Sequence, residues 1–320
     1  KRQDQYIALA NQGIENQVMP PKVLMSRVLN QIKLQNVDSY INSPFYDAFE
    51  VLPDEISSQE QEQIREQAQI TITYVVIPSY VKLLNFFENS YYPNCRDTIG
   101  ISDIKNGSQY YELIARQFTT TELTPDEIHN IGLSEVTRIK NEMFKIMDQV
   151  QWNGSFDEFL DYLRTDSQFY FETGEELFTE YLATSKRIDP LLVKLFKDLP
   201  SMPYGLKPIP MESAPDTTTA YYQRPAADGS RAGYYYVNLY MPEVRPKYEI
   251  EALSLHEAMP GHHLQIAYTM ELDLPNFRKY GGYTAFVEGW GLYAESLGED
   301  LGMYKDCLLY TSDAADDRLS

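Results

Sequence analysis

Residues 251–268 read EALSLHEAMPGHHLQIAY and contain the most informative pattern in the chain. Apolar residues lead into this segment and out of it, which predicts two buried helical turns separated by a Pro-Gly break. Three of the chain's four histidines stand here, namely His256, His262 and His263. Buried helix turns hold their side chains rigidly, and a metal site requires such rigid ligands.

The spacing of these histidines admits two interpretations. A common zinc motif has a His-Glu pair and a second His four residues after the first, one helical turn later. After His256-Glu257 that position is occupied by Pro260. A bend at Pro260 could bring His262 or His263 back toward His256, which would make a stretched variant of the motif. Alternatively, the cluster is a surface patch or a set of hydrogen-bonded core imidazoles.

A candidate third ligand lies downstream, where residues 286–295 read FVEGWGLYAE. Glu288 and Glu295 are seven residues apart and therefore share one helix face. A carboxylate in an apolar segment needs a metal or a cation as partner once it is buried. The alternative is a solvated amphipathic face, an interpretation that suits Glu295 better than Glu288. Two His and one Glu from a second helix would give the three protein ligands of a catalytic zinc site.

These two segments, 256–265 and 286–295, resemble the DUF885 family, and residues 118–129 and 233–238 add weaker matches. The resemblance covers residues 1–306. It implies a mostly bacterial protein, often a lipoprotein or secreted, with a helical fold similar to zinc peptidases of the gluzincin type. A periplasmic or extracellular location is the corresponding expectation.

The resemblance also implies roles for individual residues. One zinc ion would bind His256, His262 and Glu288, and Glu257 would act as the general base. Within the family, the residue after the second His varies more than that His does, which favours His262 over His263 as the ligand.

Composition limits the class of partner. The 320 residues carry a formal net charge of −20, which argues against binding nucleic acid or an anionic membrane and mildly favours neutral or basic substrates. Two cysteines cannot form a disulfide framework or a thiolate metal site. No apolar run approaches the length of a membrane span.

Local signals place most of the helices. Helix starts are expected at Ser58, which opens a capping box, and at Thr124, Ser155, Thr173 and Asp189. Pro78 is expected to kink or divide the helix that begins at Ser58. His129, in the first turn after Thr124, is interpreted as structural.

Residues 200–249 contain several prolines and predict strands in place of helices. Residues 220–224 and 233–240 read as two strands joined by a turn at Asp228-Gly229. Tyr234, Tyr235 and Tyr236 are candidate substrate-binding residues, because an exposed strand beside a peptidase site can bind substrate backbone by strand addition. Plain sheet packing explains the same tyrosines equally well.

We therefore predict a mainly α fold within a single large domain, residues 1–306, with a β-hairpin in residues 200–249 and metal-site helices in residues 250–300. Residues 307–320 resemble a translated sequencing adapter and are expected to be a non-native tail that replaces a longer C-terminal portion.

The predicted activity is zinc-dependent hydrolysis of a peptide or a small related amide. The alternatives are a binding protein that keeps a zinc-peptidase scaffold without turnover, and a helical module that binds no metal.

Overall fold

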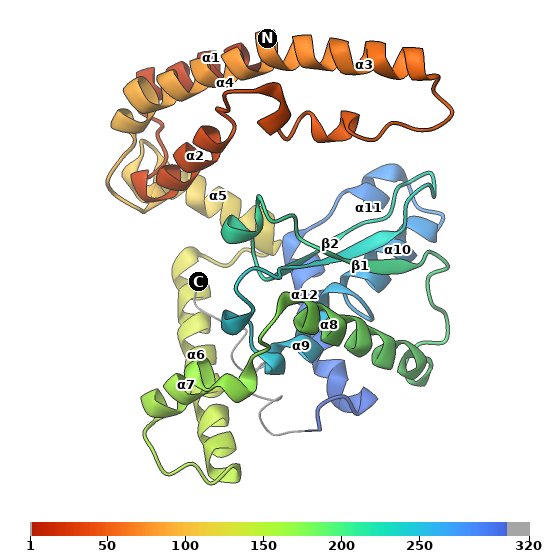
Figure 1. The fold of residues 1–320 in the computed structure, drawn as a ribbon. Coiled ribbons are helices and arrows are strands. Elements are labelled where there is room, and N and C mark those ends of the chain that lie inside the picture. The colour runs from red at the N-terminus through yellow and green to blue at the C-terminus, as the bar shows by residue number, and fades with distance from the viewer. Residues whose placement is uncertain (1, 306–320) are drawn as a thin grey trace. The chain divides into compact units, whose positions relative to one another are not determined.

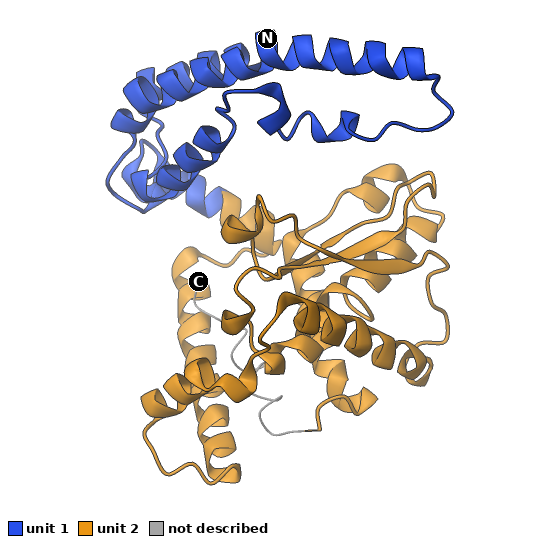
Figure 2. Cartoon of the chain, viewed as in Figure 1, with its two compact units in different colours: residues 1–113 blue, residues 114–320 orange. Residues whose placement is uncertain are grey.

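The structure is a computed structural model that describes residues 2–305 (Figure 1). The described chain is mainly helical and contains a small sheet of three strands, which confirms the predicted fold class. It divides into two compact units, residues 1–113 and residues 114–320 (Figure 2). The expectation of one domain over residues 1–306 stays a prediction, and the expected tail, 307–320, lies outside the described residues.

The first unit is built from helices. They are α1 (Arg2–Glu15), α2 (Lys22–Leu34), α3 (Ser58–Thr71), α4 (Ile77–Phe86) and the start of α5 (Gly107–Thr119). A true capping box opens α3, but the cap is Ser57 with Glu60, one residue earlier than predicted. Both α1 and α2 pack against α4.

Pro78 does not divide the helix that begins at Ser58. A π-helical segment, Ile72–Val76, joins α3 to α4 without a break, and the Ile77 N–H donates to the Ile72 carbonyl five residues back. Proline has no N–H and its ring clashes with the carbonyl four residues earlier in a regular α-helix. The wider π-turn just before Pro78 lets the helix continue.

The resulting helix runs from Ser58 to Asn94, and one 18-residue window has a mean hydropathy of 1.4. It is therefore long and apolar enough to cross a membrane, although no span was expected from the sequence. Length and composition do not distinguish a membrane span from a helix of a soluble protein. The expected lack of a span stays a prediction.

The second unit contains the other helices and the sheet. They are α6 (Pro125–Gln149), α7 (Phe156–Thr165), α8 (Gly174–Ile188), α9 (Ile250–Glu257), α10 (His262–Glu271), α11 (Asn276–Tyr280) and α12 (Thr284–Leu301). The predicted caps Thr124, Ser155 and Thr173 each form a capping box with the Glu three residues later. The stretch from Asp189 forms a short 3-10 helix, Asp189–Lys194.

The sheet contains the two predicted strands and one that was not predicted. β2 (Ala220–Gln223) pairs antiparallel with β3 (Gly233–Val237), and β1 (Tyr204–Pro208) pairs parallel with the other edge of β3. The order β1-β3-β2 puts the tyrosine-rich strand in the centre. The region is therefore a mixed sheet and not a simple hairpin.

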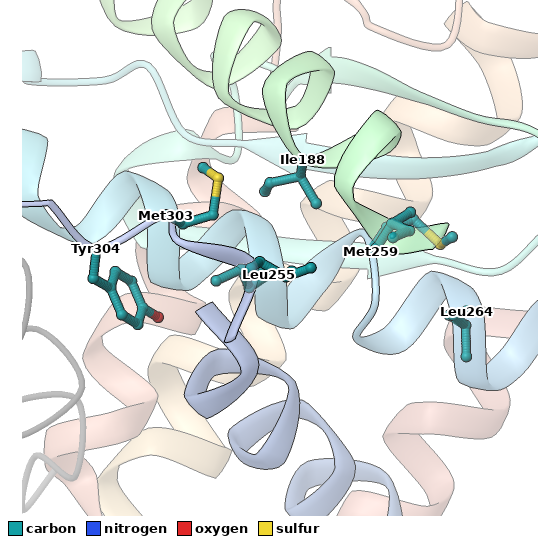
Figure 3. Close-up of a cluster of buried hydrophobic side chains, with 8 residues drawn as sticks. Ile188, Leu255, Met259, Leu264, Met303 and Tyr304 are labelled. Carbon is teal, nitrogen blue, oxygen red and sulfur yellow. The ribbon is translucent and has the colours of Figure 1, made fainter. Parts of the chain in front are cut away.

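Two apolar clusters hold the metal-motif helices in place. One joins the end of α8 to α9, α10 and the end of α12, and its buried members are Ile188, Leu192, Leu255, Met259, Leu264, Leu301, Met303 and Tyr304 (Figure 3). The other packs α8 and α9 against the sheet through Leu177, Tyr181, Ala220, Tyr235, Val237, Ile250 and Ala258. The helix that carries His256 is therefore buried on both sides.

Substitution of Tyr235 tests the packing of the cluster between the sheet and the helices α8 and α9. The side chain is fully buried and its ring meets the Tyr181 ring edge-on at 5.8 Å. Tyr235→Ala should lower the free energy of unfolding by about 3–5 kcal/mol, because it leaves a large cavity. Tyr236→Ala, on the other face of the same strand, should cost only about 1 kcal/mol through its stacking on Tyr221. Urea unfolding measures both, and equal losses would contradict the packing described here.

Candidate metal centre

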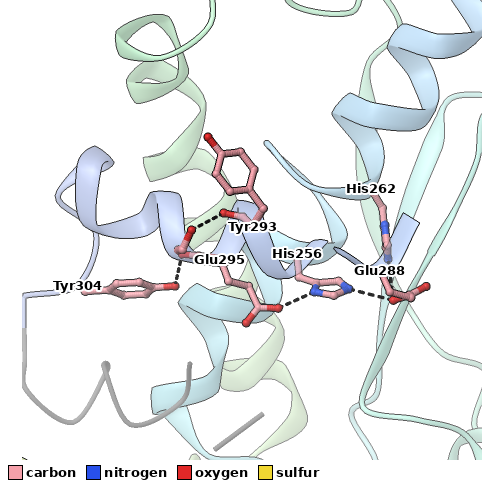
Figure 4. A network of polar contacts seen from close by, with 7 residues as sticks. His256, His262, Glu288, Tyr293, Glu295 and Tyr304 are labelled. Carbon is pink, nitrogen blue, oxygen red and sulfur yellow. Dashed lines mark hydrogen bonds and ion pairs between the residues drawn. The ribbon is translucent and has the colours of Figure 1, made fainter. Parts of the chain in front are cut away.

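Three predicted ligands meet at one point. His256 lies in the last turn of α9, His262 begins α10, and Glu288 lies in the first half of α12. Their candidate ligand atoms all lie within 4.8 Å of one another. Nε2 of His256 and Nε2 of His262 lie 3.6 and 3.7 Å from the same carboxylate oxygen of Glu288 (Figure 4). The arrangement could hold a metal ion.

The turn at Pro260-Gly261 replaces the helical turn of the common motif. α9 ends at Glu257 and α10 starts at His262, so the extra residues form a bend between two helices. A Cβ on Gly261 would lie 1.8 Å from the His256 carbonyl oxygen, a separation that no side chain tolerates. Only glycine lets the chain fold back this tightly, and this bend brings His262 next to His256.

α12 lies close against the His256 ring. A Cβ on Gly291 would lie only 2.4 Å from Cε1 of His256. The Trp290 indole N–H donates to the Pro260 carbonyl at 2.9 Å, which ties α12 to the bend as well. Gly291 therefore leaves the space in which the imidazole is seated.

Glu295 is the second carboxylate partner of His256. One of its oxygens lies 2.5 Å from Nδ1 of His256, and its side chain is 1% exposed, whereas that of Glu288 is 55% exposed. The preference for a solvated Glu295 was therefore wrong. A carboxylate on the second nitrogen fixes the orientation and tautomer of a metal-binding His and makes it a better ligand.

The pKa values of the ring nitrogens reflect these surroundings. Burial alone would lower the pKa of His256, but the hydrogen bond to Glu295 and the nearby carboxylates raise it above its usual value. Burial lowers the pKa of His262 to about 4, which keeps this ring neutral, as a metal ligand must be. Nδ1 of His262 is buried and has no hydrogen-bond partner within residues 2–305.

His263 is occupied by other partners. Its Nδ1 lies 2.7 Å from the Tyr222 hydroxyl of β2, and its Nε2 lies 3.0 Å from the Met202 carbonyl just before β1. Because both ring nitrogens are engaged, His263 links α10 to the sheet and leaves the ligand position to His262. His129 is exposed in the first turn of α6 and does not belong to the cluster.

Glu257 is a buried carboxylate beside the candidate ligands. Burial raises its pKa to about 7, and the neighbouring Glu288 carboxylate adds to this shift. A hydrogen bond from the Tyr222 backbone acts in the opposite direction and shows that β2 passes next to this carboxylate. The site thus combines three possible ligands with one further carboxylate that can exchange a proton near neutral pH.

The tyrosines of β3 lie in two different environments. Tyr235 is fully buried in the core, which corrects its expected role in substrate binding. Tyr234 and Tyr236 are half-buried on the opposite face of the sheet, where Lys207 lies 3.9 Å above the Tyr234 ring. Their contact with substrate stays a prediction.

Sequence reasoning missed the roles of Glu295, Gly291 and Tyr222. The seven-residue spacing of the two glutamates was a usable signal, since a helix face that presents Glu288 to His256 also presents Glu295. The contact between Tyr222 and His263 joins residues 41 positions apart and has no local signal.

Two glycines of α12 provide a matched test of this geometry. Gly291→Ala should lower the free energy of unfolding by about 1–3 kcal/mol through overpacking against His256. At Gly289, nothing apart from the helix's own backbone lies within 4 Å of an added methyl group. Gly289→Ala should therefore raise the free energy of unfolding by up to about 1 kcal/mol, because alanine has the better helix propensity. Thermal and urea unfolding compare the two variants. If Gly291→Ala proved as harmless as Gly289→Ala, the close approach of α12 to His256 would be refuted.

Comparisons with known proteins agree with this picture of the fold. A solved structure, the putative lipoprotein from Colwellia psychrerythraea, is 28% identical and superimposes with a TM-score of 0.89. The match covers 97% of this chain but 55% of that one, so the chain spans little more than half the length of this relative. No curated protein matches the chain. The family described as bacterial protein of unknown function (DUF885) matches residues 1–316, and the chain therefore belongs to the DUF885 family.

Proposed function

We propose that this protein is a zinc-dependent hydrolase that cleaves peptide or related amide bonds. The observation that carries the proposal is the convergence of His256, His262 and Glu288 on one point beside the buried carboxylate of Glu257. The two histidines and the base come from one short segment around Pro260, and the third ligand, Glu288, comes from α12.

The donor set fits zinc. Two imidazole nitrogens and one carboxylate oxygen, with a fourth position left for water or substrate, is the ligand arrangement of one class of catalytic zinc sites. The contact of Glu295 with His256 supplies the outer carboxylate that such sites use. When bound, zinc would supply Lewis acidity, which polarises a carbonyl group and acidifies water.

Glu257 is the residue that would move the proton. Its carboxylate is next to the ligands, and its pKa lies near neutrality because it is buried. A base with such a pKa can accept a proton from water and return it to the leaving amine in the same pH range.

The free edge of β2 suits the binding of an extended substrate. In an antiparallel pair, every second residue of a strand points its backbone N–H and carbonyl groups toward the partner strand. The Asn238 N–H donates to the Thr219 carbonyl, so Thr219 faces β3 and Tyr222, three residues later, points its backbone groups away from β3. No further strand pairs with that edge within residues 2–305. An extended peptide could add to it by backbone hydrogen bonds, next to Glu257.

The relative described as a lipoprotein supports a location outside the cytoplasm. We extend that location to this chain as part of the proposal, with a peptide as the partner and no nucleic acid. The net charge of −20 agrees with the exclusion of nucleic acid as a partner.

Two substitutions separate the roles of ligand and base. Glu257→Gln should retain one bound zinc and lose turnover by about 10²–10⁴-fold, because it removes the proton acceptor and no ligand. His256→Ala should lose the zinc itself. Metal content by plasma mass spectrometry and cleavage of a mixed peptide library are the two measurements.

His129→Ala and Glu299→Gln serve as controls, since both residues are exposed and lie outside the cluster. Both should keep the metal and the rate of the parent protein. A parent protein that binds zinc and cleaves nothing would instead be a binding protein on this scaffold, and undiminished turnover in Glu257→Gln would exclude the proposed base.

A further inference from the structure

Two arginines flank the loop that connects β2 to β3. Arg224 directly follows the last residue of β2, and Arg231 lies two residues before β3 begins. The Arg231 guanidinium donates to the Gln223 side-chain oxygen at 3.0 Å, to the Arg224 carbonyl at 3.0 Å and to the Ala232 carbonyl at 3.2 Å. These neutral acceptors hold the guanidinium in place and leave its charge uncompensated.

Among the described residues, neither arginine has a carboxylate partner. Within residues 2–305, no Asp or Glu oxygen lies within 4.0 Å of either guanidinium, and the exposed Arg224 side chain makes no hydrogen bond. The acidic residue of the same loop, Asp228, accepts instead from the Ser230 backbone at 3.0 Å and from its hydroxyl at 2.6 Å. Two guanidiniums without a carboxylate partner among the described residues thus stand in a chain with 47 acidic and 27 basic residues.

Tyr222 links these arginines to the candidate metal centre. Its hydroxyl contacts His263, the residue after the candidate ligand His262, and its backbone donates to Glu257. Burial raises the pKa of the Tyr222 hydroxyl, and the positive charges of Arg224 and Arg231 oppose that rise, as expected for groups in the same neighbourhood. Along a strand, two residues span about 7 Å, so Arg224 follows Tyr222 by roughly that distance on the free edge of β2.

We propose that Arg224 and Arg231 bind a carboxylate of the substrate close to the scissile bond, so that the site selects anionic peptides. This inference rests on the proposed hydrolase function and adds the substrate class. The carboxylate is either the chain end or the side chain of an acidic residue, because a guanidinium recognises both with the same paired hydrogen bonds. The local charge thus reverses the preference for neutral or basic substrates that the net charge indicates.

The net charge of the protein does not prevent this selection. Salt screens exposed charges beyond about 8 Å at physiological ionic strength, so the distant acidic surface contributes little at the site. A carboxylate that reaches the end of β2 meets Arg224 and the Arg231 guanidinium, which donates to the Arg224 carbonyl. Charge-assisted hydrogen bonds of this kind are about twice as strong as neutral ones.

Three peptides of one parent sequence test the proposal on the zinc-loaded full chain. One has a free C-terminus, the second is its C-terminal amide, and the third is the amide with a Glu next to the scissile bond in place of Gln. The protein should cleave at least one of the carboxylate-bearing peptides with a kcat/KM about tenfold or more above that of the neutral amide. Which of them is favoured identifies the source of the carboxylate.

Arg224→Gln should lower the kcat/KM of the favoured carboxylate-bearing peptide about tenfold and so abolish this preference. Arg164→Gln, at another exposed arginine with no carboxylate partner within the described residues, should retain the preference of the parent protein. Equal cleavage of all three peptides, or a preference that survives Arg224→Gln, would overturn the inference and leave the proposed hydrolase function intact.

If no peptide is cleaved, the hydrolase proposal fails and calorimetric binding of the same three peptides decides the inference. Tighter binding of a carboxylate-bearing peptide, lost in Arg224→Gln, would support it. Binding that is absent or independent of the carboxylate would overturn it.

Discussion

The candidate site depends on the close approach of α12 to α9. The backbone of α12 comes so near at Gly291 that the imidazole of His256 occupies the space of a missing side chain. Because of this approach, carboxylates on both sides of Gly291 reach the same ring. Glu288 lies one turn before the glycine and faces Nε2, and Glu295 lies one turn after it and contacts Nδ1. A slip of α12 by one residue would remove both contacts.

The bend between α9 and α10 depends on the same helix. Trp290 donates from α12 to the Pro260 carbonyl, so the bend is held from outside by a hydrogen bond as well as from inside by the absence of a side chain at Gly261. Tyr304, just beyond α12, donates to the backbone carbonyl of Glu295 at 2.8 Å and closes the arrangement from the other end. α12 thus contacts the His256 ring, the bend at Pro260 and the segment at Tyr304.

His263 extends this arrangement to the sheet. Its two nitrogens reach Tyr222 on β2 and Met202 before β1, while Glu271, at the end of the same helix, accepts from the Ser201 and Met202 N–H groups at 2.8 and 3.0 Å. Both ends of α10 therefore contact the segment that leads into β1. The edge strand that would bind substrate is fixed relative to the candidate ligands by these contacts.

Local chemistry explains what the sequence could predict. The caps Thr124, Ser155 and Thr173 act over three residues. Spacing and residue type grouped the histidine cluster with Glu288, and the family resemblance favoured His262 over His263 as the ligand. β1 could not be predicted, because its pairing with β3 joins segments about 29 residues apart in register and short strands carry weak signals. The burial of Tyr235 followed from the central position of β3, which only the third strand reveals.

Anomalous diffraction from crystals of the protein grown with zinc would locate a bound metal ion directly. We expect one strong peak at which Nε2 of His256, Nε2 of His262 and a carboxylate oxygen of Glu288 lie about 2.0–2.2 Å from the ion, while Glu295 stays on Nδ1 of His256. The absence of a peak between these residues, or an ion held by His263 in place of His262, would contradict the proposed zinc site.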